Sequence, residues 1–305
     1  MGSDNESDNK TTEFNHADHP PFRVYTPAEQ RVPYIFNSPH SGRNYPTSLQ
    51  NTSCLTDHQL RSSEDVLVDQ LFASVVEIGA PLLTADFPRA WLDVNREPYE
   101  LDPKLFQERL PAHANIRSLR VAGGLGTIPR LVAENMPIYA SPPSLEQAMD
   151  RIETVYRPYH QTLRSLMAQS VARFDYAVLV DCHSMPSASV KGESHNYPDI
   201  IIGDRYGTSC NGEISRELMR RFSDLGYQVA RNKPYAGGFI TEHYGRPLKG
   251  LHAVQIEINR SIYIDEISLQ PTAGFQTLTR DIRSVMGHLV NLPDSGFTSI
   301  SVAAE

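Results

Sequence analysis

Short apolar runs that alternate with segments of helical periodicity constrain the fold of this chain more than any other feature. The clearest run covers residues 176–180, and similar runs cover residues 32–37, 81–85, 91–94, 199–203, 227–230 and 251–258. Apolar runs of this length, bounded by turn residues, are typical of buried strands. Apolar residues recur at helical spacing between them, in residues 63–79, 144–172, 211–224 and 272–290. This alternation predicts one α/β domain with a mixed, mostly parallel sheet and helices on both faces.

Both ends of the chain are polar. Residues 1–21 are rich in Ser, Asp, Asn, Glu and Thr, with little to bury, and residues 294–305 follow the last predicted helix. We expect both to be tails around a domain of residues 22–293. His16 and His19 fall in the first tail, where solvated histidines are a better interpretation than metal ligands.

Composition narrows the class of protein. The net charge is -8, and no Lys/Arg cluster is present, which argues against a nucleic-acid partner. No apolar run is long enough to span a bilayer, and the first residues lack the apolar core of a signal peptide. Three cysteines without a paired pattern indicate a reducing compartment, so we expect a cytoplasmic protein. The oligomeric state is left open.

Two of the predicted strands lead directly into a histidine. Residues 176–180 continue into Asp181 and His183, and residues 32–37 end at His40, in the motif Ser-Pro-His-Ser-Gly. Open α/β sheets bind ligands beyond the carboxyl ends of their strands, so the two imidazoles can meet there. A neutral imidazole is a standard zinc ligand, and Asp181 could orient His183 through the second ring nitrogen. For His183 alone, a hydrogen-bonded histidine at the end of a strand is as good an interpretation as a metal ligand.

A catalytic zinc needs a third protein ligand and one position left for water. Glu64 and Asp65 stand at the start of a predicted helix and could supply a carboxylate. Acids at a helix start are also favoured by the helix dipole alone, which is the stronger interpretation of the pair without further information.

Glu257 is the best candidate for a general base. Strand alternation places Gln255 and Glu257 on the face opposite Val254, Ile256 and Ile258. A buried carboxylate must be paired, protonated or close to a metal, and a base beside a zinc-bound water meets these conditions. A salt bridge between Glu257 and Arg260, or exposure of this sheet face, is the structural alternative.

Several cationic and polar residues could form the walls of a substrate pocket. Arginine pairs two-pronged with a carboxylate, which suits an acidic substrate, although single arginines are more often structural. His243 could help to stabilise negative charge at the reacting carbonyl. The candidates are Arg89, Asn95, Arg96, His243 and Arg246.

Five motifs in a fixed order carry a family resemblance. They are Asn37 to Gly42, Glu64 to Asp69, Arg89 to Arg96, Asp181 to Ser184, and Gly237 to Pro247. From about residue 32 to 265 the chain resembles the N-formylglutamate amidohydrolase family, whose members are similar in fold to zinc carboxypeptidases and aminoacylases. The resemblance implies hydrolysis of N-formyl-L-glutamate to formate and glutamate, the last step of one histidine-degradation route.

The resemblance also implies roles for particular residues. His40 and His183 match the metal histidines of the family, Asp65 matches the acidic ligand better than Glu64, and Glu257 corresponds to the general base. The His-x-x-Glu pair of typical carboxypeptidases is absent, because Arg43 stands where its glutamate would be. We therefore expect a Zn²⁺-dependent amidohydrolase that acts on a small acidic N-acyl amino acid, with other divalent transition metals left open.

Three other functions stay open at this point. A carboxypeptidase-type metallopeptidase would need a cleft for a longer chain, and a non-catalytic binding protein could keep the same fold. Nucleophilic hydrolysis through Cys182 or Ser184 is disfavoured, because no Gly-x-Ser-x-Gly elbow surrounds them.

Overall fold

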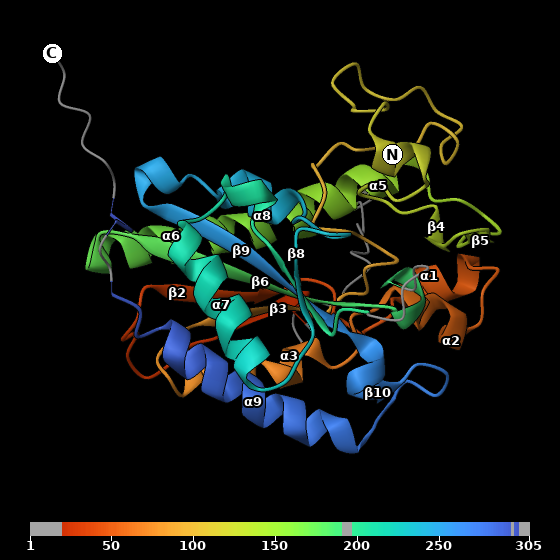
Figure 1. Ribbon diagram of the computed structural model, residues 1–305. Coiled ribbons are helices and arrows are strands. Elements are labelled where there is room, and N and C mark those ends of the chain that lie inside the picture. Colours follow the sequence, from red (N-terminus) through yellow and green to blue (C-terminus); the bar gives the residue numbers. More distant parts are fainter. Residues whose placement is uncertain (1–19, 191–196, 294–295, 299–305) are drawn as a thin grey trace, which may run out of the picture.

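The computed structural model describes residues 20–190, 197–293 and 296–298. Its central feature is a seven-stranded sheet with the order β1-β3-β2-β6-β9-β7-β8 (Figure 1). The strands are β1 (Phe22–Tyr25), β2 (Tyr34–Ser38), β3 (Leu82–Ala85), β6 (Ala177–Met185), β7 (Ile200–Gly203), β8 (Val229–Arg231) and β9 (Leu251–Asn259). β1 runs antiparallel to β3 and β7 to β9, and the other neighbouring pairs are parallel. The predicted mixed, mostly parallel sheet is confirmed. The two histidines of the N-terminal stretch, His16 and His19, lie outside the described residues.

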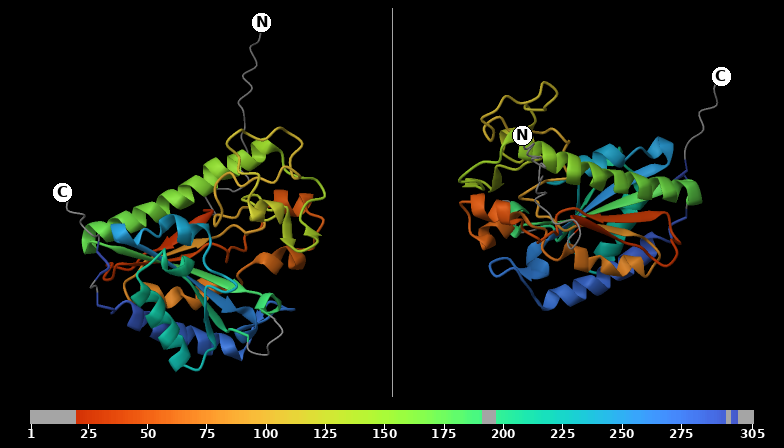
Figure 2. Two further views of the ribbon diagram at one scale, coloured as in Figure 1. Left: turned by 45° about the horizontal axis from the view of Figure 1, so that its top comes forward. Right: turned by 180° about the vertical axis from the view of Figure 1, so that it is seen from behind.

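Helices cover both faces of this sheet, as predicted (Figures 1 and 2). One layer consists of α3 (Val68–Leu71), α7 (Gly212–Asp224) and α9 (Ala273–Leu289). The opposite layer consists of α5 (Leu145–Arg151), α6 (Arg157–Phe174) and α8 (Phe239–Tyr244). Among the described residues, no helix is both long enough and apolar enough to cross a membrane.

Smaller elements lie around the sheet. They are α1 (Thr47–Thr52), α2 (Asp57–Leu60), α4 (Leu119–Ala122), the hairpin β4 (Leu131–Ala133) and β5 (Met136–Pro137), and the pair β10 (Ile264–Asp265) and β11 (Gln270–Pro271). The helix α4 and the β4–β5 hairpin belong to the excursion of residues 97–144, which contributes one wall of the cavity described below.

Side-chain alternation along β6 and β9 explains where a polar site can form. Val180 and Ile256 point into the core beneath α7 and α9, whereas Leu179 and Ala253 point into the core beneath α6 and α8. On this second face the apolar residues give way to polar ones toward the carboxyl ends of both strands. Those polar residues are Asp181, His183, Gln255 and Glu257. The sheet is therefore apolar through its middle and polar at one edge.

The long helix predicted for residues 144–172 forms with one local change. Ser144 caps α5, and a π-helical turn (Ile152–Tyr156) joins α5 to α6. Pro158 lies in the first turn of α6, directly after this turn. A proline within a helix removes one backbone hydrogen bond and distorts the helix locally, and the π-turn lies directly before it.

The prediction of one helix over residues 63–79 is wrong. Leu67 adopts a left-handed conformation with φ of 60°, and only α3 and a short 3₁₀ turn (Ala73–Val76) follow it. Glu64 is extended and Asp65 precedes Leu67, so neither acid sits in a helical first turn. The expected apolar face is nevertheless buried, because Val68 and Leu71 still pack against the sheet.

Two further expectations need correction. Residues 91–94 form a turn instead of a strand, since the amides of Trp91 and Leu92 both donate to the carbonyl of Pro88. Phe297 lies within the stretch expected to be a polar tail, yet it is buried between Tyr176 and His252. His252 also hydrogen-bonds the carbonyl of Phe297 at 2.8 Å, so this part of the C-terminal stretch is docked.

Candidate active site

A cavity of about 770 Å³ opens at the carboxyl ends of β2, β6 and β9. Its lining combines residues from these strands with loops far apart in the sequence, including the excursion that carries α4 and the segment before α8. This is the position in which open α/β sheets bind their ligands. The volume lies in the range typical of small-molecule sites.

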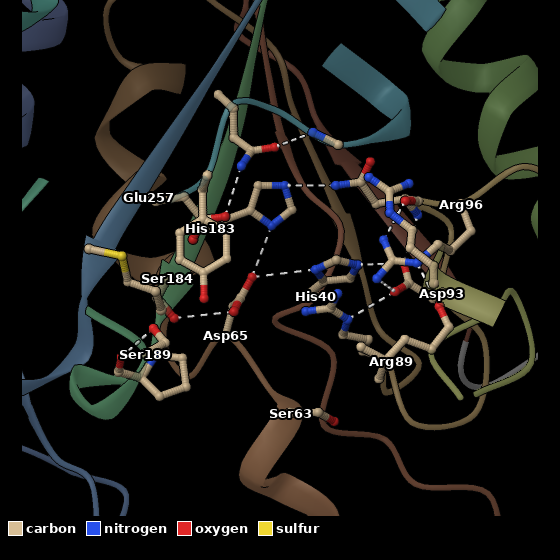
Figure 3. A pocket seen from close by; sticks show the side chains of 18 of the residues that line it. His40, Ser63, Asp65, Arg89, Asp93, Arg96, His183, Ser184, Ser189 and Glu257 are labelled. Carbon is tan, nitrogen blue, oxygen red and sulfur yellow. Dashed lines mark hydrogen bonds and ion pairs between the residues drawn. The ribbon is translucent and has the colours of Figure 1, made fainter. Parts of the chain in front are cut away.

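The three predicted metal ligands meet at the bottom of this cavity (Figure 3). Nδ1 of His183 lies 3.0 Å from Oδ2 of Asp65, and Nδ1 of His40 lies 3.4 Å from the same oxygen. The backbone amide of Asp65 also donates to the carbonyl of His40 at 3.0 Å, which fixes the two segments against each other. All three side chains are buried.

Each histidine is oriented by a carboxylate on its other ring nitrogen. Nε2 of His40 lies 2.8 Å from Oδ1 of Asp93, and Nε2 of His183 lies 2.8 Å from Oδ2 of Asp181. A proton on each Nε2 would leave both Nδ1 atoms free to act as ligands, which is the arrangement common around zinc histidines. Asp181 therefore lies where it was expected, and Asp93 plays the same part for His40.

Asp181 is itself held by a buried chain of hydrogen bonds. Asn37 donates from Nδ2 to Oδ1 of Asp181 at 2.7 Å, and the Tyr159 hydroxyl donates to Oδ1 of Asn37 at 2.5 Å. Tyr159 comes from α6, Asn37 from β2 and Asp181 from β6, so three elements together fix the carboxylate that orients His183. The orientation of His183 is thus built into the core instead of depending on a surface loop.

The donor set fits a divalent transition metal. Ligand atoms of His40, Asp65 and His183 all lie within 4.8 Å of one another, and two imidazoles with one carboxylate are donors that zinc accepts. Nδ1 of His40 is buried and makes no hydrogen bond in the described part of the chain. A buried acceptor of this kind normally has a partner, and a cation between the three side chains would supply it.

The pKa values of Asp65 and His183 are shifted because carboxylates and imidazoles lie close together in this buried site. Burial opposes ionisation of Asp65, but the neighbouring imidazoles of His183 and His40 outweigh that effect and hold its pKa well below the usual range. Burial also opposes protonation of His183, yet the carboxylates of Asp181 and Asp65 raise its pKa well above the usual value. The site therefore favours positive charge between its carboxylates.

Glu257 lies beside this group on the neighbouring strand. It pairs in register with His183, and its Oε1 accepts a hydrogen bond from Nε2 of Gln255 at 2.8 Å. Burial raises the pKa of Glu257 to about 7; the charge of Asp65 adds to the rise and that of His183 opposes it. A carboxyl group with such a pKa can both accept and release a proton near neutral pH.

Arg260 does not form the salt bridge that we considered for Glu257. Its guanidinium instead contacts Oδ1 of Asp65 at 3.2 Å, the hydroxyl of Ser184 at 3.1 Å and the carbonyl of Ser62 at 2.9 Å. Arg260 thus fixes the carboxylate that faces the two histidines. Glu257 keeps no arginine partner within hydrogen-bonding distance among the described residues.

Three of the predicted pocket residues line the cavity. Arg89 donates from Nε to Oδ2 of Asp93 at 2.9 Å, and Arg96 reaches the same oxygen at 3.3 Å. Asn95 places Nδ2 3.3 Å from Nε2 of His183, and its Oδ1 accepts the amide of Ile240 at 2.8 Å. This segment therefore forms part of the cavity wall.

Three other predicted residues lie elsewhere. Glu64 is buried away from the histidines and pairs with Nε of Arg61 at 2.8 Å, which excludes it as the alternative acidic ligand. His243 is exposed on α8 and stacks on Phe239, outside the cavity lining. Arg246 is also exposed, and it donates to the carbonyls at the end of α8 instead of facing a substrate.

Asp93, Gln255 and Arg260 were not singled out as functional residues from the sequence. Asp93 is the most informative of them, because it contacts His40 and two arginines at once. Its place between Arg89 and Arg96, in a stretch predicted to be a strand, was the available signal. An aspartate flanked by two arginines at spacings of three and four residues indicates a paired charge cluster.

A mostly parallel α/β sheet with a buried His–Asp–His group and a carboxylate beside it defines an α/β protein with a candidate catalytic metal centre. A sequence model described as N-formylglutamate amidohydrolase matches residues 32–264. The chain therefore belongs to the N-formylglutamate amidohydrolase family, as the order of its motifs predicted.

Individual relatives agree with this assignment. The chain is 28% identical over 263 residues to an N-formylglutamate deformylase of Pseudomonas aeruginosa, covering 85% of this chain and 92% of that one. It is 29% identical over 239 residues to the N-formylglutamate deformylase of Pseudomonas putida, covering 77% and 83%. The crystal structure of an N-formylglutamate amidohydrolase from Ralstonia eutropha JMP134 superposes with a TM-score of 0.83 at 32% identity, covering 88% of this chain and 97% of that one. A gene product of Agrobacterium tumefaciens shares the fold, with a TM-score of 0.67 at 17% identity over 91% and 96% of the two chains.

Proposed function

We propose that this protein is a zinc-dependent amidohydrolase that cleaves N-formyl-L-glutamate to formate and L-glutamate. The observation that carries the proposal is the buried group of His40, Asp65 and His183 with Glu257 on the adjacent strand. The names of the Pseudomonas relatives support the choice of substrate. Such an activity suits the end of a histidine-degradation route.

In this proposal the ligands are Nδ1 of His40, Nδ1 of His183 and the carboxylate of Asp65. A zinc ion bound there would lower the pKa of water to about 7 and polarise the formyl carbonyl. Asp93 and Asp181 would keep the two imidazoles in the tautomer that leaves Nδ1 free, since each lies 2.8 Å from an Nε2 atom. Arg260 would keep the Asp65 carboxylate in place through its 3.2 Å contact.

Glu257 would carry the proton through the reaction. It accepts a proton from the attacking water as the water oxygen bonds to the formyl carbon. It then donates the proton to the amide nitrogen as the C–N bond breaks, which releases glutamate with a free amine and leaves formate. The pKa of about 7, caused mainly by burial, suits a group that must do both near neutral pH.

The same features support the finer expectations about the chain. We keep the bounds of the catalytic domain at residues 22–293, within which the seven-stranded sheet and its helices lie, with Phe297 of the C-terminal stretch packed onto it. The three cysteines are free, which supports a reducing compartment such as the cytoplasm.

The experiment is a substrate panel measured by formate and amine release. The purified protein is incubated with N-formyl-L-glutamate, N-acetyl-L-glutamate, N-formyl-L-methionine and glutamate-terminated dipeptides. We expect formate from N-formyl-L-glutamate with the highest kcat/KM of the set. Release of amino acids from the dipeptides, without formate from any formyl substrate, would instead favour a carboxypeptidase-type enzyme.

A further inference from the structure

Five arginines line the cavity, and four of them already bind groups of the protein. Arg89 and Arg96 share Asp93, and Arg96 also donates to the carbonyls of Leu125 and Asn95 at 2.7 Å each. Arg205 forms an ion pair with Glu242 at 2.7 Å, and Arg260 is held by Asp65, Ser184 and Ser62. Arg96, Arg205 and Arg260 are paired on several nitrogens each and have little capacity left for a substrate. Arg89 donates to Asp93 through Nε alone, so the other nitrogens of its guanidinium can still meet a ligand.

Arg120 is the exception. It lines the cavity from α4 and is half-buried, and its side chain makes no hydrogen bond or ion pair within the described residues. A cation in a concave site without a protein partner is available to a negatively charged ligand.

The backbone around Arg120 is well fixed even though its side chain is free. The Ser118 hydroxyl caps α4 by accepting the amide of Val121 at 3.1 Å, and Val121 is buried. The carbonyl of Arg120 accepts the amide of Leu125 at 2.8 Å, and the carbonyl of Leu125 in turn accepts Nε of Arg96. These bonds tie α4 to the buried Arg96 instead of leaving it as a free loop.

The two carboxylates of an N-formylglutamate molecule lie at different distances from the bond that breaks. The α-carboxylate is attached to the carbon that carries the amide nitrogen, whereas the side-chain carboxylate lies three bonds from that carbon. Arg89 contacts Asp93, which in turn contacts His40, so it stands next to the reacting centre. Arg120 belongs to the excursion of residues 97–144 and contacts none of the metal-binding side chains, so it suits the more distant carboxylate.

We propose that Arg120 binds the side-chain carboxylate of the substrate and sets the preference for acidic N-formyl amino acids, while Arg89 faces the α-carboxylate. This inference rests on the proposed function and adds the residue that selects the substrate. Two carboxylates would also relieve the crowding of positive charge along this wall. Burial lowers the pKa of Arg96 to about 10, and the neighbouring charges of Arg89 and Arg120 add to that effect although Asp93 opposes it.

The test compares two substrates that differ only in the side-chain group, N-formyl-L-glutamate and N-formyl-L-glutamine. Arg120→Gln is expected to lower kcat/KM for the glutamate substrate about 10- to 100-fold, mainly through KM, because one charge-assisted contact is lost. The value for the glutamine substrate should change by less than about threefold, since no carboxylate meets position 120 in that complex. Arg120→Lys keeps the positive charge but loses the planar guanidinium, so its kcat/KM for the glutamate substrate should lie between those of the wild type and Arg120→Gln.

Arg117→Gln serves as the matched control, because Arg117 is an exposed arginine of the same excursion that does not line the cavity. Circular dichroism and the melting temperature show whether each variant is folded. An equal loss on both substrates, or no loss on either, in a folded Arg120→Gln protein would overturn the inference. A wild-type protein that releases no formate from N-formyl-L-glutamate would overturn the proposed function itself, and this inference with it.

Discussion

Replacing Glu257 by glutamine separates the activity of this side chain from its effect on stability. The two side chains have nearly the same shape, and the carbonyl oxygen of the introduced amide could still accept the hydrogen bond that Gln255 donates at 2.8 Å. The neighbouring His183 and Asp65 therefore keep their surroundings. Because an amide cannot accept a proton from water, turnover of N-formyl-L-glutamate by Glu257→Gln should fall about 10²- to 10⁴-fold in kcat.

The same substitution should lower turnover but raise the free energy of unfolding of the metal-free protein at pH 8. Burial raises the pKa of Glu257 from 4.5 to about 7, so the folded protein binds more protons than the unfolded chain between these values. The charged carboxylate thus costs stability as pH rises from about 4.5 through about 7. At pH 8 the metal-free Glu257→Gln protein should be more stable than the metal-free wild type by about 3 kcal/mol, taken as 1.36 kcal/mol per pKa unit.

The assays are formate release under saturating substrate and urea unfolding after chelation, at pH 5 and pH 8. In the metal-loaded wild type, the acid limb of the activity profile should lie at or below about pH 7, since a nearby cation lowers the pKa of Glu257 from its raised value of about 7. Glu257→Gln is expected to lose this limb. Full turnover by the variant would refute its role as the base, and a variant less stable at pH 8 would refute the electrostatic reasoning.

Three more predictions follow from individual contacts. Asp181→Asn weakens the partner of Nε2 of His183 and should lower zinc affinity about 10- to 100-fold, measured by competition with a chelating dye; unchanged affinity would argue against the carboxylate's part. Gly238→Ala would place a Cβ well inside van der Waals contact with the side-chain amide of Asn95, so we expect a lower melting temperature and a displaced Asn95 side chain. An unchanged melting temperature together with an unmoved Asn95 would contradict the close approach of Gly238 to Asn95. Burial lowers the pKa of His160 to about 4, so stability should be lost as pH falls from about 6.5 to about 4, by up to about 3 kcal/mol. His160→Gln should remove much of that pH dependence in urea unfolding, and an unchanged slope would exclude His160 as its source.

The sequence predicted the sheet and the two histidines because both depend on local patterns. A buried strand is indicated by its apolar run, and His40 and His183 follow or extend such runs directly. The position of Glu257 beside His183 could be predicted for the same reason, since strand alternation fixes the face on which it lies.

Other features depend on contacts that are distant in sequence. Asp93 contacts His40 across 53 positions, and no local pattern indicates that pair. The helix predicted over residues 63–79 fails at Leu67, which adopts a positive φ that a leucine rarely takes. Just before it, the amide of Asp65 donates to the carbonyl of His40, a contact that no local pattern indicates. His243 was misplaced because the facing of a six-residue helix depends on its neighbours, which bury Ile240 and Tyr244 and leave His243 outside.

The most informative single experiment measures formate release from N-formyl-L-glutamate by the same protein sample before chelation, after chelation, and after addition of one equivalent of zinc. The buried His40, Asp65 and His183 group predicts activity at the start, loss of activity with the metal, and recovery when zinc returns. Undiminished formate release from protein shown to be free of transition metals would contradict it.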